Sequence, residues 1–150
     1  MVARFALATE IAAPVGRVFD LCLDVEAHLR SMARSRERAI AGRTDGILEL
    51  DDQVTWRARH FGIPWKMTVR ITELDRPRRF VDQQVTGPFE SFRHQHDFEP
   101  TREGTRMTDT IEFVAPFGLI GRLAESLVLE RRLRTLIEVR NRYLQQAAAG

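Results

Sequence analysis

The chain has 150 residues, a length that suits one domain with a sizeable core. Hydrophobic residues make up 43% and charged residues 29%, as in ordinary globular proteins, and no segment approaches the roughly 18 uncharged apolar residues of a membrane span. Because Cys22 is the only cysteine and the N-terminal segment lacks a signal-peptide pattern, we expect a single cytoplasmic domain over residues 1–150, without integral membrane association.

The charge of the chain is modest and arginine-rich. The formal net charge is +2, although the pI is about 9.3. Lys66 is the only lysine, and the arginines alternate with acidic residues along the chain. Nucleic-acid-binding surfaces show a basic stripe, and no such stripe interleaved with aromatic residues is present here. The pattern indicates a solvated arginine-rich surface, and we expect no nucleic-acid partner.

The N-terminal part predicts a strand followed by two short helices. Residues 4–13 alternate in polarity, which is typical of a strand. Pro14 suits the first turn of a helix over residues 14–24, whose apolar stripe includes Phe19. A second short helix is predicted over residues 25–33.

From residue 53 to residue 114, the alternation predicts an antiparallel meander of strands. Pairing His60 with Trp65 across a turn at Gly62 and Pro64 keeps the apolar residues of the first two strands on one inward face. That inward face consists of Val54, Trp56, Ala58, His60, Trp65, Met67, Val69 and Ile71.

Residues 92–98, with the sequence FRHQHDF, place two of the four histidines on one face of a strand. Pairing this strand with the next one so that His96 faces Asp109 brings opposite charges together on the outer face, as in Arg93 and Glu112. A slip by one residue would move charge into the core, so this register is favoured.

The strand before this hairpin covers residues 80–86 and leads into a turn at Gly87 and Pro88. Extending the register over that turn places Gln83 opposite His94. Gln83 is therefore expected on the inward face.

The C-terminal part, residues 116–149, predicts a long helical segment. Its two apolar stripes point in different directions, so we expect a bend or break near residue 127. Arg140 falls inside the second stripe. A curved sheet must cover its apolar face, and this helix is the only long candidate. The predicted fold class is α+β, with six to seven antiparallel strands wrapped around the C-terminal helix.

The inward face of the predicted sheet combines apolar and polar side chains. A buried polar group without a partner costs roughly 1–3 kcal/mol, so these groups need partners, water or a ligand. An apolar wall with a few convergent polar groups is typical of a small-molecule site. The candidate ligand-binding residues are Trp56, His60, Trp65, Met67, Gln83, Phe92, His94, His96, Asp109 and Arg140.

Three short motifs carry a family resemblance: GPF at 87–89, GT at 104–105 and PFG at 116–118. With the order of elements, they resemble the polyketide cyclase/dehydrase and lipid-transport branch of the START-like, or SRPBCC, superfamily. The resemblance covers essentially the whole chain and implies a helix-grip fold. The first two motifs are also similar to coenzyme-Q-binding relatives, but His94 and His96 stand where such a relative has a more uniformly apolar strand. The superfamily includes lipid carriers, cyclases, hormone receptors and toxins, so the resemblance does not decide activity.

Several candidate residues have more than one interpretation. Asp109 either orients His96 as a general base, which makes both residues catalytic, or forms a structural cross-strand hydrogen bond with it. Gln83 either contacts a ligand or partners His94. Arg140 grips a ligand carboxylate, pairs with a buried acid or extends to the helix edge.

His60, His94 and His96 are of a type that binds metals. However, His60 lies two strands away from the other two, and no supporting pattern accompanies them. The sequence therefore predicts no metal site, and no cofactor is expected.

Three functions are compatible with the sequence. The first is a carrier or sensor of a hydrophobic or amphipathic small molecule, such as a lipid, a polyketide or a quinone-like compound. The second is an enzyme that uses the same cavity for cyclisation or dehydration of a polyketide-like substrate. The third is a protein-interaction module with a filled core. The ligand's identity and the oligomeric state stay open.

Overall fold

The computed structural model describes residues 2–60, 63–116 and 122–149. Its elements follow one another in the order expected from the sequence. They are β1 (Ala3–Ile11), α1 (Val15–Leu23), α2 (Val25–Ser31), the 3-10 helix η1 (Ala33–Ser35), β2 (Arg38–Gly42), β3 (Gln53–His60), β4 (Ile63–Asp75), β5 (Arg79–Thr86), β6 (Ser91–Thr101), β7 (Gly104–Val114) and α3 (Arg122–Ala149). The predicted turn at Gly62 and the first part of the predicted C-terminal helical segment lie outside the described residues.

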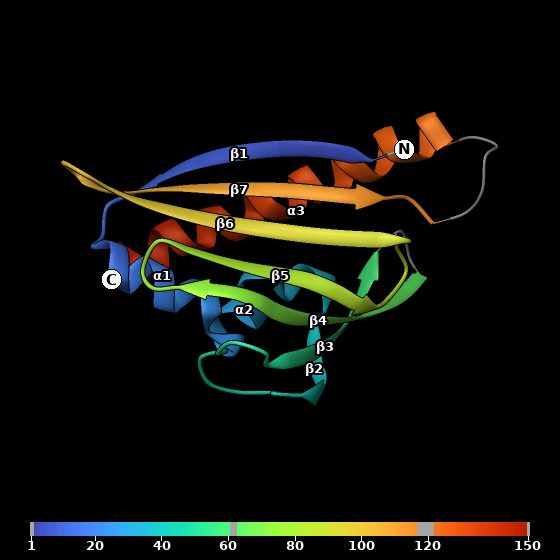
Figure 1. Cartoon of the computed structure of the whole chain (residues 1–150), viewed down its shortest axis with the longest axis horizontal. Helices are drawn as coiled ribbons and strands as arrows, with labels where there is room; N and C mark the ends of the chain where they lie inside the picture. The colour runs from blue at the N-terminus through green and yellow to red at the C-terminus, as the bar shows by residue number, and fades with distance from the viewer. Residues whose placement is uncertain (1, 61–62, 117–121, 150) are drawn as a thin grey trace.

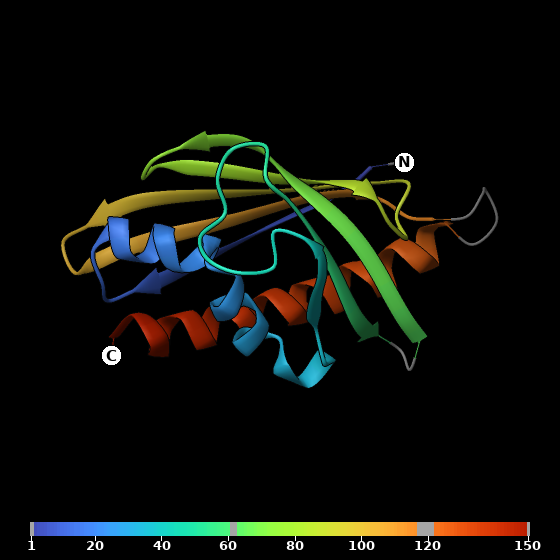
Figure 2. The same cartoon turned by 90° about the horizontal axis from the view of Figure 1, so that it is seen from below.

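The strands form one curved sheet of seven strands in the order β1-β7-β6-β5-β4-β3-β2. Every neighbouring pair is antiparallel. Figure 1 shows α3 behind the sheet, and Figure 2 shows the sheet arching over the length of α3. The predicted α+β helix-grip fold is confirmed, with two short helices after the first strand.

The two short helices are separated by Asp24, whose backbone is extended. Its carboxylate accepts hydrogen bonds from the backbone N–H groups of Glu26 (2.9 Å) and Ala27 (3.3 Å). These bonds satisfy donors that the first turn of a helix otherwise leaves without partners. The sequence therefore ends α1 and restarts α2 at this residue.

The core at one end of the sheet is built around α1. Phe19 is fully buried and makes edge contacts with Phe80 (5.6 Å between ring centroids) and Phe98 (5.1 Å). The end of α3 joins this core through Leu144 and Ala148. Because one cluster includes α1, the sheet and α3, the helix is fixed at its C-terminal end.

The register of the β6–β7 hairpin is confirmed, including the pairs His96–Asp109 and Arg93–Glu112. The register of the β3–β4 hairpin was wrong by two residues, since Trp65 pairs with Ala58 rather than with His60. A shift of two residues leaves every side chain on its predicted face.

The register of the β5–β6 hairpin was wrong by one residue. Asp82, not Gln83, pairs with His94. The cause lies in the connecting loop, where the side-chain amide of Gln84 donates to the carbonyl of Phe89 (2.8 Å) and accepts from its N–H (3.2 Å). The observed register leaves one residue more between the two pairing partners than the predicted register, and it places Asp82 on the inward face.

The expected break near residue 127 is absent, since α3 is one continuous helix of 28 residues. Leu127, which ends the first predicted stripe, is 55% exposed, so this residue does not mark a second buried face of the helix. Residues of the second stripe pack along the helix: Leu129 and Leu133 contact a cluster that includes Phe113, whereas Leu144 packs with the α1 core. No bend is therefore needed to bury the apolar side of α3.

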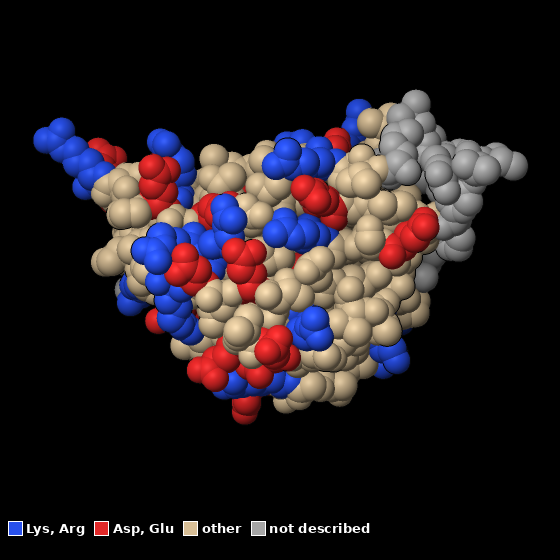
Figure 3. All heavy atoms as spheres, in the orientation of Figure 1, with Lys and Arg blue, Asp and Glu red and all other residues tan. Residues whose placement is uncertain are grey.

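The outer face of the sheet carries charges of both signs, as Figure 3 shows. Ion pairs on this face join Arg79 to Asp97 (2.6 Å) and Arg106 to Glu10 (2.7 Å). Among the described residues, no helix is long and apolar enough to span a bilayer.

The packing of α3 is tested by one substitution at two positions of that helix. Leu144 is 2% exposed and Leu127 is 55% exposed. We predict that Leu144→Ala lowers the free energy of unfolding by about 2–5 kcal/mol, because it leaves a cavity in the core. Leu127→Ala, the matched control, changes it by less than about 0.5 kcal/mol. Urea denaturation measures both, and equal losses would contradict the packing described.

Candidate functional site

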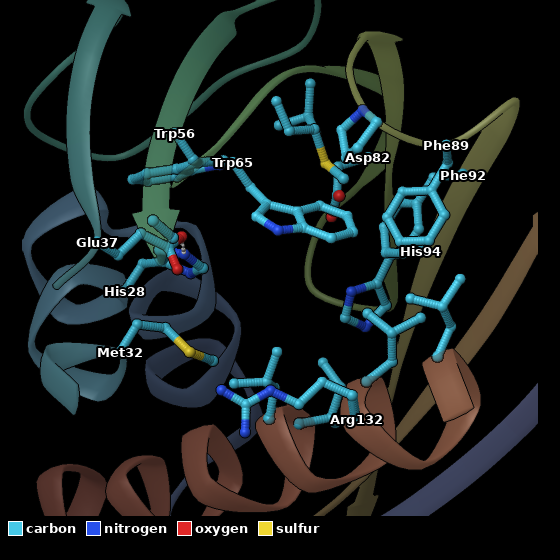
Figure 4. A pocket seen from close by; sticks show the side chains of 18 residues that line it. His28, Met32, Glu37, Trp56, Trp65, Asp82, Phe89, Phe92, His94 and Arg132 are labelled. Atoms are coloured by element: carbon cyan, nitrogen blue, oxygen red, sulfur yellow. Dashed lines mark hydrogen bonds and ion pairs between the residues drawn. The ribbon is translucent and has the colours of Figure 1, made fainter. Parts of the chain in front are cut away.

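A cavity of about 170 Å³ lies between the inner face of the sheet and α3. Figure 4 shows side chains from the sheet, from the α2 region and from α3 surrounding it. Its lining consists of His28, Met32, Glu37, Trp56, Ala58, Trp65, Met67, Val69, Asp82, Pro88, Phe89, Phe92, His94, Leu129, Arg132, Leu133, Leu136 and Ile137. The wall is therefore mainly apolar, with a few polar groups.

Four aromatic residues form the sheet side of this cavity. Trp56 and Trp65 come from β3 and β4, while Phe92 comes from β6 and Phe89 from the loop before it. Phe89 contacts Phe92 (5.1 Å between ring centroids) and Trp65 (6.1 Å). Facing them, α3 supplies leucines, so a flat apolar molecule would be enclosed by rings and aliphatic chains.

Half of the candidate residues from the sequence line this cavity, namely Trp56, Trp65, Met67, Phe92 and His94. Gln83 lines neither this cavity nor its smaller neighbour, and Asp82 takes the expected place. The side chain of His60 lies outside the described residues. The other candidates, His96, Asp109 and Arg140, belong to a polar cluster beyond the apolar wall.

Two residues that sequence reasoning missed, His28 and Glu37, form a pair at the cavity wall. His28 Nε2 lies 2.5 Å from Glu37 Oε1, and the imidazole packs on Trp56 with 4.1 Å between ring centroids. The available signal was the spacing of His28 and Met32, which places both on one face of the helix predicted over residues 25–33.

A second cavity of about 80 Å³ adjoins the first. The two share His28, Trp56, Val69, Asp82 and His94 as lining residues. His96 and Arg140 line only the smaller cavity. We call it the polar chamber, because its wall holds most of the buried charged and titratable groups.

Asp109 is the centre of the polar cluster, with 0% of the residue exposed. Its Oδ1 accepts hydrogen bonds from His94 Nε2 (2.7 Å) and Arg140 Nη2 (2.5 Å), and its Oδ2 accepts one from Asn141 Nδ2 (2.9 Å). Arg140 and Asn141 both come from α3. Of the three interpretations of Arg140, the structure places it against a buried acid.

His96 lies opposite Asp109 in the register, yet its hydrogen bond goes elsewhere. Its Nε2 donates to Asp82 Oδ2 (2.7 Å), while its Nδ1 lies 3.4 Å from Asp109 Oδ1. The ring is stacked between Phe80 (4.0 Å between centroids) and His94 (3.7 Å). The single expected pair is thus two pairs, His94 with Asp109 and His96 with Asp82.

The charge states follow from burial and from these contacts. Burial would raise the pKa of Asp109, but Arg140 and the adjacent imidazoles of His94 and His96 together hold it well below its usual value. Burial would likewise raise the pKa of Asp82, yet its hydrogen bond from His96 brings the net shift below the usual value. Both carboxyls are therefore ionised at neutral pH.

Burial lowers the pKa of His94 to about 4, with His96 as the second cause. The opposing contact with Asp109 raises it by less. His94 is therefore a neutral imidazole whose Nε2 carries the proton. Burial also favours the neutral form of Arg140, but Asp109 and other anionic neighbours raise its pKa overall, so it stays charged.

The side chains of Asp82, His94 and His96 meet the composition of a metal site, with ligand atoms within 4.8 Å of one another. A zinc ion needs ring nitrogens that converge at about 2.0–2.1 Å from it. The two imidazole planes are stacked at 21°, so their lone pairs run side by side. Both Nε2 atoms also donate to carboxylates. We therefore assign no metal to this cluster.

The curved sheet, the long helix and the cavity between them define a START-like helix-grip protein. Solved structures share this fold. They include the Zhui aromatase/cyclase from Streptomyces sp. R1128 (15% identity, 99% of this chain and 94% of that chain, TM-score 0.81) and Ara h 8.0201 (10% identity, 97% and 99%, TM-score 0.70). Another is TTHA0849 from Thermus thermophilus (21% identity, 99% of each chain, TM-score 0.73).

The chain belongs to the polyketide cyclase/dehydrase and lipid transport family, whose model matches residues 2–149. The match confirms the resemblance that the GPF, GT and PFG motifs indicated. No curated protein matches the sequence. At these identities the solved structures establish the fold and leave the ligand to be argued from the cavity.

The neutral state of His94 predicts how stability depends on pH. In the unfolded chain its pKa returns to about 6.5, so below that pH the unfolded state binds more protons than the folded state. Stability that is present above pH 6.5 is lost as the pH falls towards 4. We predict that His94 alone removes about 2 kcal/mol of the free energy of unfolding between pH 7 and pH 5.

His94→Gln is the matched variant for this measurement, because it keeps a hydrogen-bonding side chain that does not titrate. Urea denaturation at the two pH values should give a smaller loss for the variant than for the wild type, by about 2 kcal/mol. The same loss in both proteins would show that His94 is not held neutral.

Proposed function

We propose that this protein binds a hydrophobic or amphipathic small molecule in the cavity between the sheet and α3, as a carrier or sensor. A lipid, a polyketide or a quinone-like compound fits this description. The observation that carries the proposal is the mainly apolar cavity of about 170 Å³ with His94 and Asp82 on its wall. Ligand pockets typically combine such an apolar lining with a few placed polar groups.

The energetics favour occupancy by an apolar body. Trp56, Trp65, Phe89 and Phe92 offer a large aromatic surface to the space, and its contact with an apolar ligand removes that surface from water. A packed core would have closed this volume. The cavity therefore also counts against an interaction module with a filled core.

The comparisons support the same class of ligand. The family description names polyketide cyclases, dehydrases and lipid transport, and one structural neighbour is called an aromatase/cyclase. Both kinds of protein handle largely apolar molecules. A carrier and an enzyme thus share the first requirement, which is the cavity.

The chain contains its own reporter for this binding, since both of its tryptophans line the cavity. We predict that 1-aminoanthracene, a flat neutral probe, binds with one site per chain. Binding should transfer excitation energy from Trp56 and Trp65 to the probe. Fluorescence titration of the purified protein measures both stoichiometry and Kd.

Ala58→Leu fills part of the cavity, because Ala58 is buried in its lining. Extra methyl groups in a packed site cost about 1–3 kcal/mol, so Kd should rise roughly tenfold or more. Ala6→Leu, at an exposed position of β1, is the matched control and should leave Kd unchanged. Absence of saturable probe binding, or equal binding by both variants, would refute the proposal.

Acid–base catalysis in the same cavity is the second candidate function. The observation that favours it is a neutral imidazole, His94, that lines the cavity and is oriented by Asp109. Cyclisation or dehydration of a polyketide-like substrate needs such a proton acceptor. However, a pKa of about 4 makes His94 a weak base at neutral pH, so we place binding ahead of catalysis.

Opening of 5-nitrobenzisoxazole tests for a base in the cavity without knowledge of the natural substrate. A base removes the ring C–H proton, the N–O bond breaks, and a coloured cyanophenolate forms. If the protein is a carrier, the wild type should open 5-nitrobenzisoxazole no faster than His94→Gln does, and its rate should not saturate with substrate concentration. A saturable rate that falls roughly 10²–10⁴-fold in His94→Gln, and is retained in Ala6→Leu, would instead establish the catalytic function.

A further inference from the structure

The polar chamber continues the apolar cavity rather than forming a separate site. Asp82 and His94 line both spaces, while Arg140 and His96 line only the chamber. A ligand whose apolar body occupies the larger cavity therefore has one end next to the chamber. The groups in the chamber decide which chemical end is accepted.

Two hydrogen-bonding atoms in the chamber wall are unused. Arg140 donates through Nε and Nη2, and Asp82 accepts through Oδ2. Among the described residues, Arg140 Nη1 and Asp82 Oδ1 make no hydrogen bond. The first is a donor and the second is an acceptor. A hydroxyl group, which accepts and donates at once, matches this pair.

The third polar atom near the chamber is His96 Nδ1, and it is turned away from the open space. His96 is 3% exposed, and its Nδ1 lies 3.4 Å from Asp109 Oδ1, behind the chamber wall. The groups of the chamber that can receive a ligand are therefore those of Arg140 and Asp82.

The charge in the chamber restricts that group further. Two acidic residues, Asp24 and Asp82, line the chamber, and the ionised Asp109 lies directly behind its wall. Arg140 and His28 also line it, but Arg140 is already paired with Asp109 and His28 with Glu37. His94 is neutral. A ligand carboxylate would therefore enter beside the ionised Asp82 without a cation that is free to compensate it, which is strongly unfavourable at low dielectric.

We propose that the polar chamber is a head-group site that selects a neutral hydroxyl end, as in a phenol or an alcohol, and excludes a carboxylate. This inference rests on the proposed function, since the apolar body must first occupy the larger cavity. It narrows the ligand class from lipids in general to hydroxylated apolar molecules, and it disfavours free fatty acids.

The test compares four compounds that share the naphthalene ring system and differ in the group attached to it. Naphthalene, 2-naphthol, 2-naphthoate and 2-naphthylmethylamine compete with 1-aminoanthracene for the wild-type protein at neutral pH. We expect 2-naphthol to bind at least about tenfold more tightly than 2-naphthoate, because like charges across a binding site cost several kcal/mol. Naphthalene should lie between them, and 2-naphthylmethylamine should not exceed 2-naphthol.

Asp82→Asn assigns the selectivity to the chamber. It removes one negative charge and keeps the size of the side chain, so the preference for 2-naphthol over 2-naphthoate should fall to within about threefold. Asp97→Asn is the matched control, because Asp97 points to the outer face of β6, where it pairs with Arg79. That control should keep the wild-type preference. Circular dichroism and 1-aminoanthracene binding confirm that both variants fold.

Each outcome has a distinct meaning. If no naphthalene compound displaces the probe and the probe itself does not bind, the proposed function fails. If the probe binds but 2-naphthoate equals or exceeds 2-naphthol, the head-group inference is overturned while the cavity proposal stands. Tightest binding by 2-naphthylmethylamine would also overturn it, in favour of a cation site at Asp82.

Discussion

A buried carboxylate, Asp109, determines how the sheet and α3 fit together. It receives Arg140 and Asn141 from α3 and His94 from the neighbouring strand, with no contact with solvent. Loss of one partner would leave a buried charge unpaired, at a cost of about 3–5 kcal/mol. Asn141 also donates to Thr9 on β1 (2.9 Å), so the cluster ties α3 to the edge of the sheet. The C-terminal part of the helix is thus held by these polar contacts and, one turn further on, by the α1 core.

This arrangement explains why a cavity persists beside it. Where α3 is fixed by Arg140 and Leu144, the helix packs closely against the sheet and α1. Further towards its N-terminus, Leu129 and Leu133 face a sheet that curves away, and the aromatic side chains of β3, β4 and β6 do not fill the space. A buried ion pair adds little net stability compared with apolar packing. The effect of the cluster is therefore mainly geometric: it sets the spacing and orients His94.

Local patterns in the sequence were sufficient to predict part of the site. Alternating charges on the outer face were sufficient for the β6–β7 register, and hence for His94, His96 and Asp109 on one face. The same logic failed at β5, because the Gln84–Phe89 hydrogen bonds that widen the loop have no signature in alternation. It also missed which histidine bonds Asp109. In the register His96 is opposite, but stacking on Phe80 and a bond to Asp82 turn its ring aside. Such side-chain choices depend on neighbours from three strands and a helix.

Carrier and enzyme interpretations of this cavity differ in one physical quantity, the proton affinity of the imidazole on its wall. In the free protein, burial outweighs the nearby Asp109 and holds the pKa of His94 at about 4. A bound hydroxyl group that donates to Asp82 would add a hydrogen bond without adding charge. It would therefore leave the imidazole neutral. A ligand with developing positive charge would instead be stabilised by the carboxylate of Asp82 in the wall, with Asp109 behind it. The polar chamber would thus favour binding of a neutral molecule without proton transfer. Proton transfer to His94 would require a substrate whose own charge stabilises the protonated imidazole.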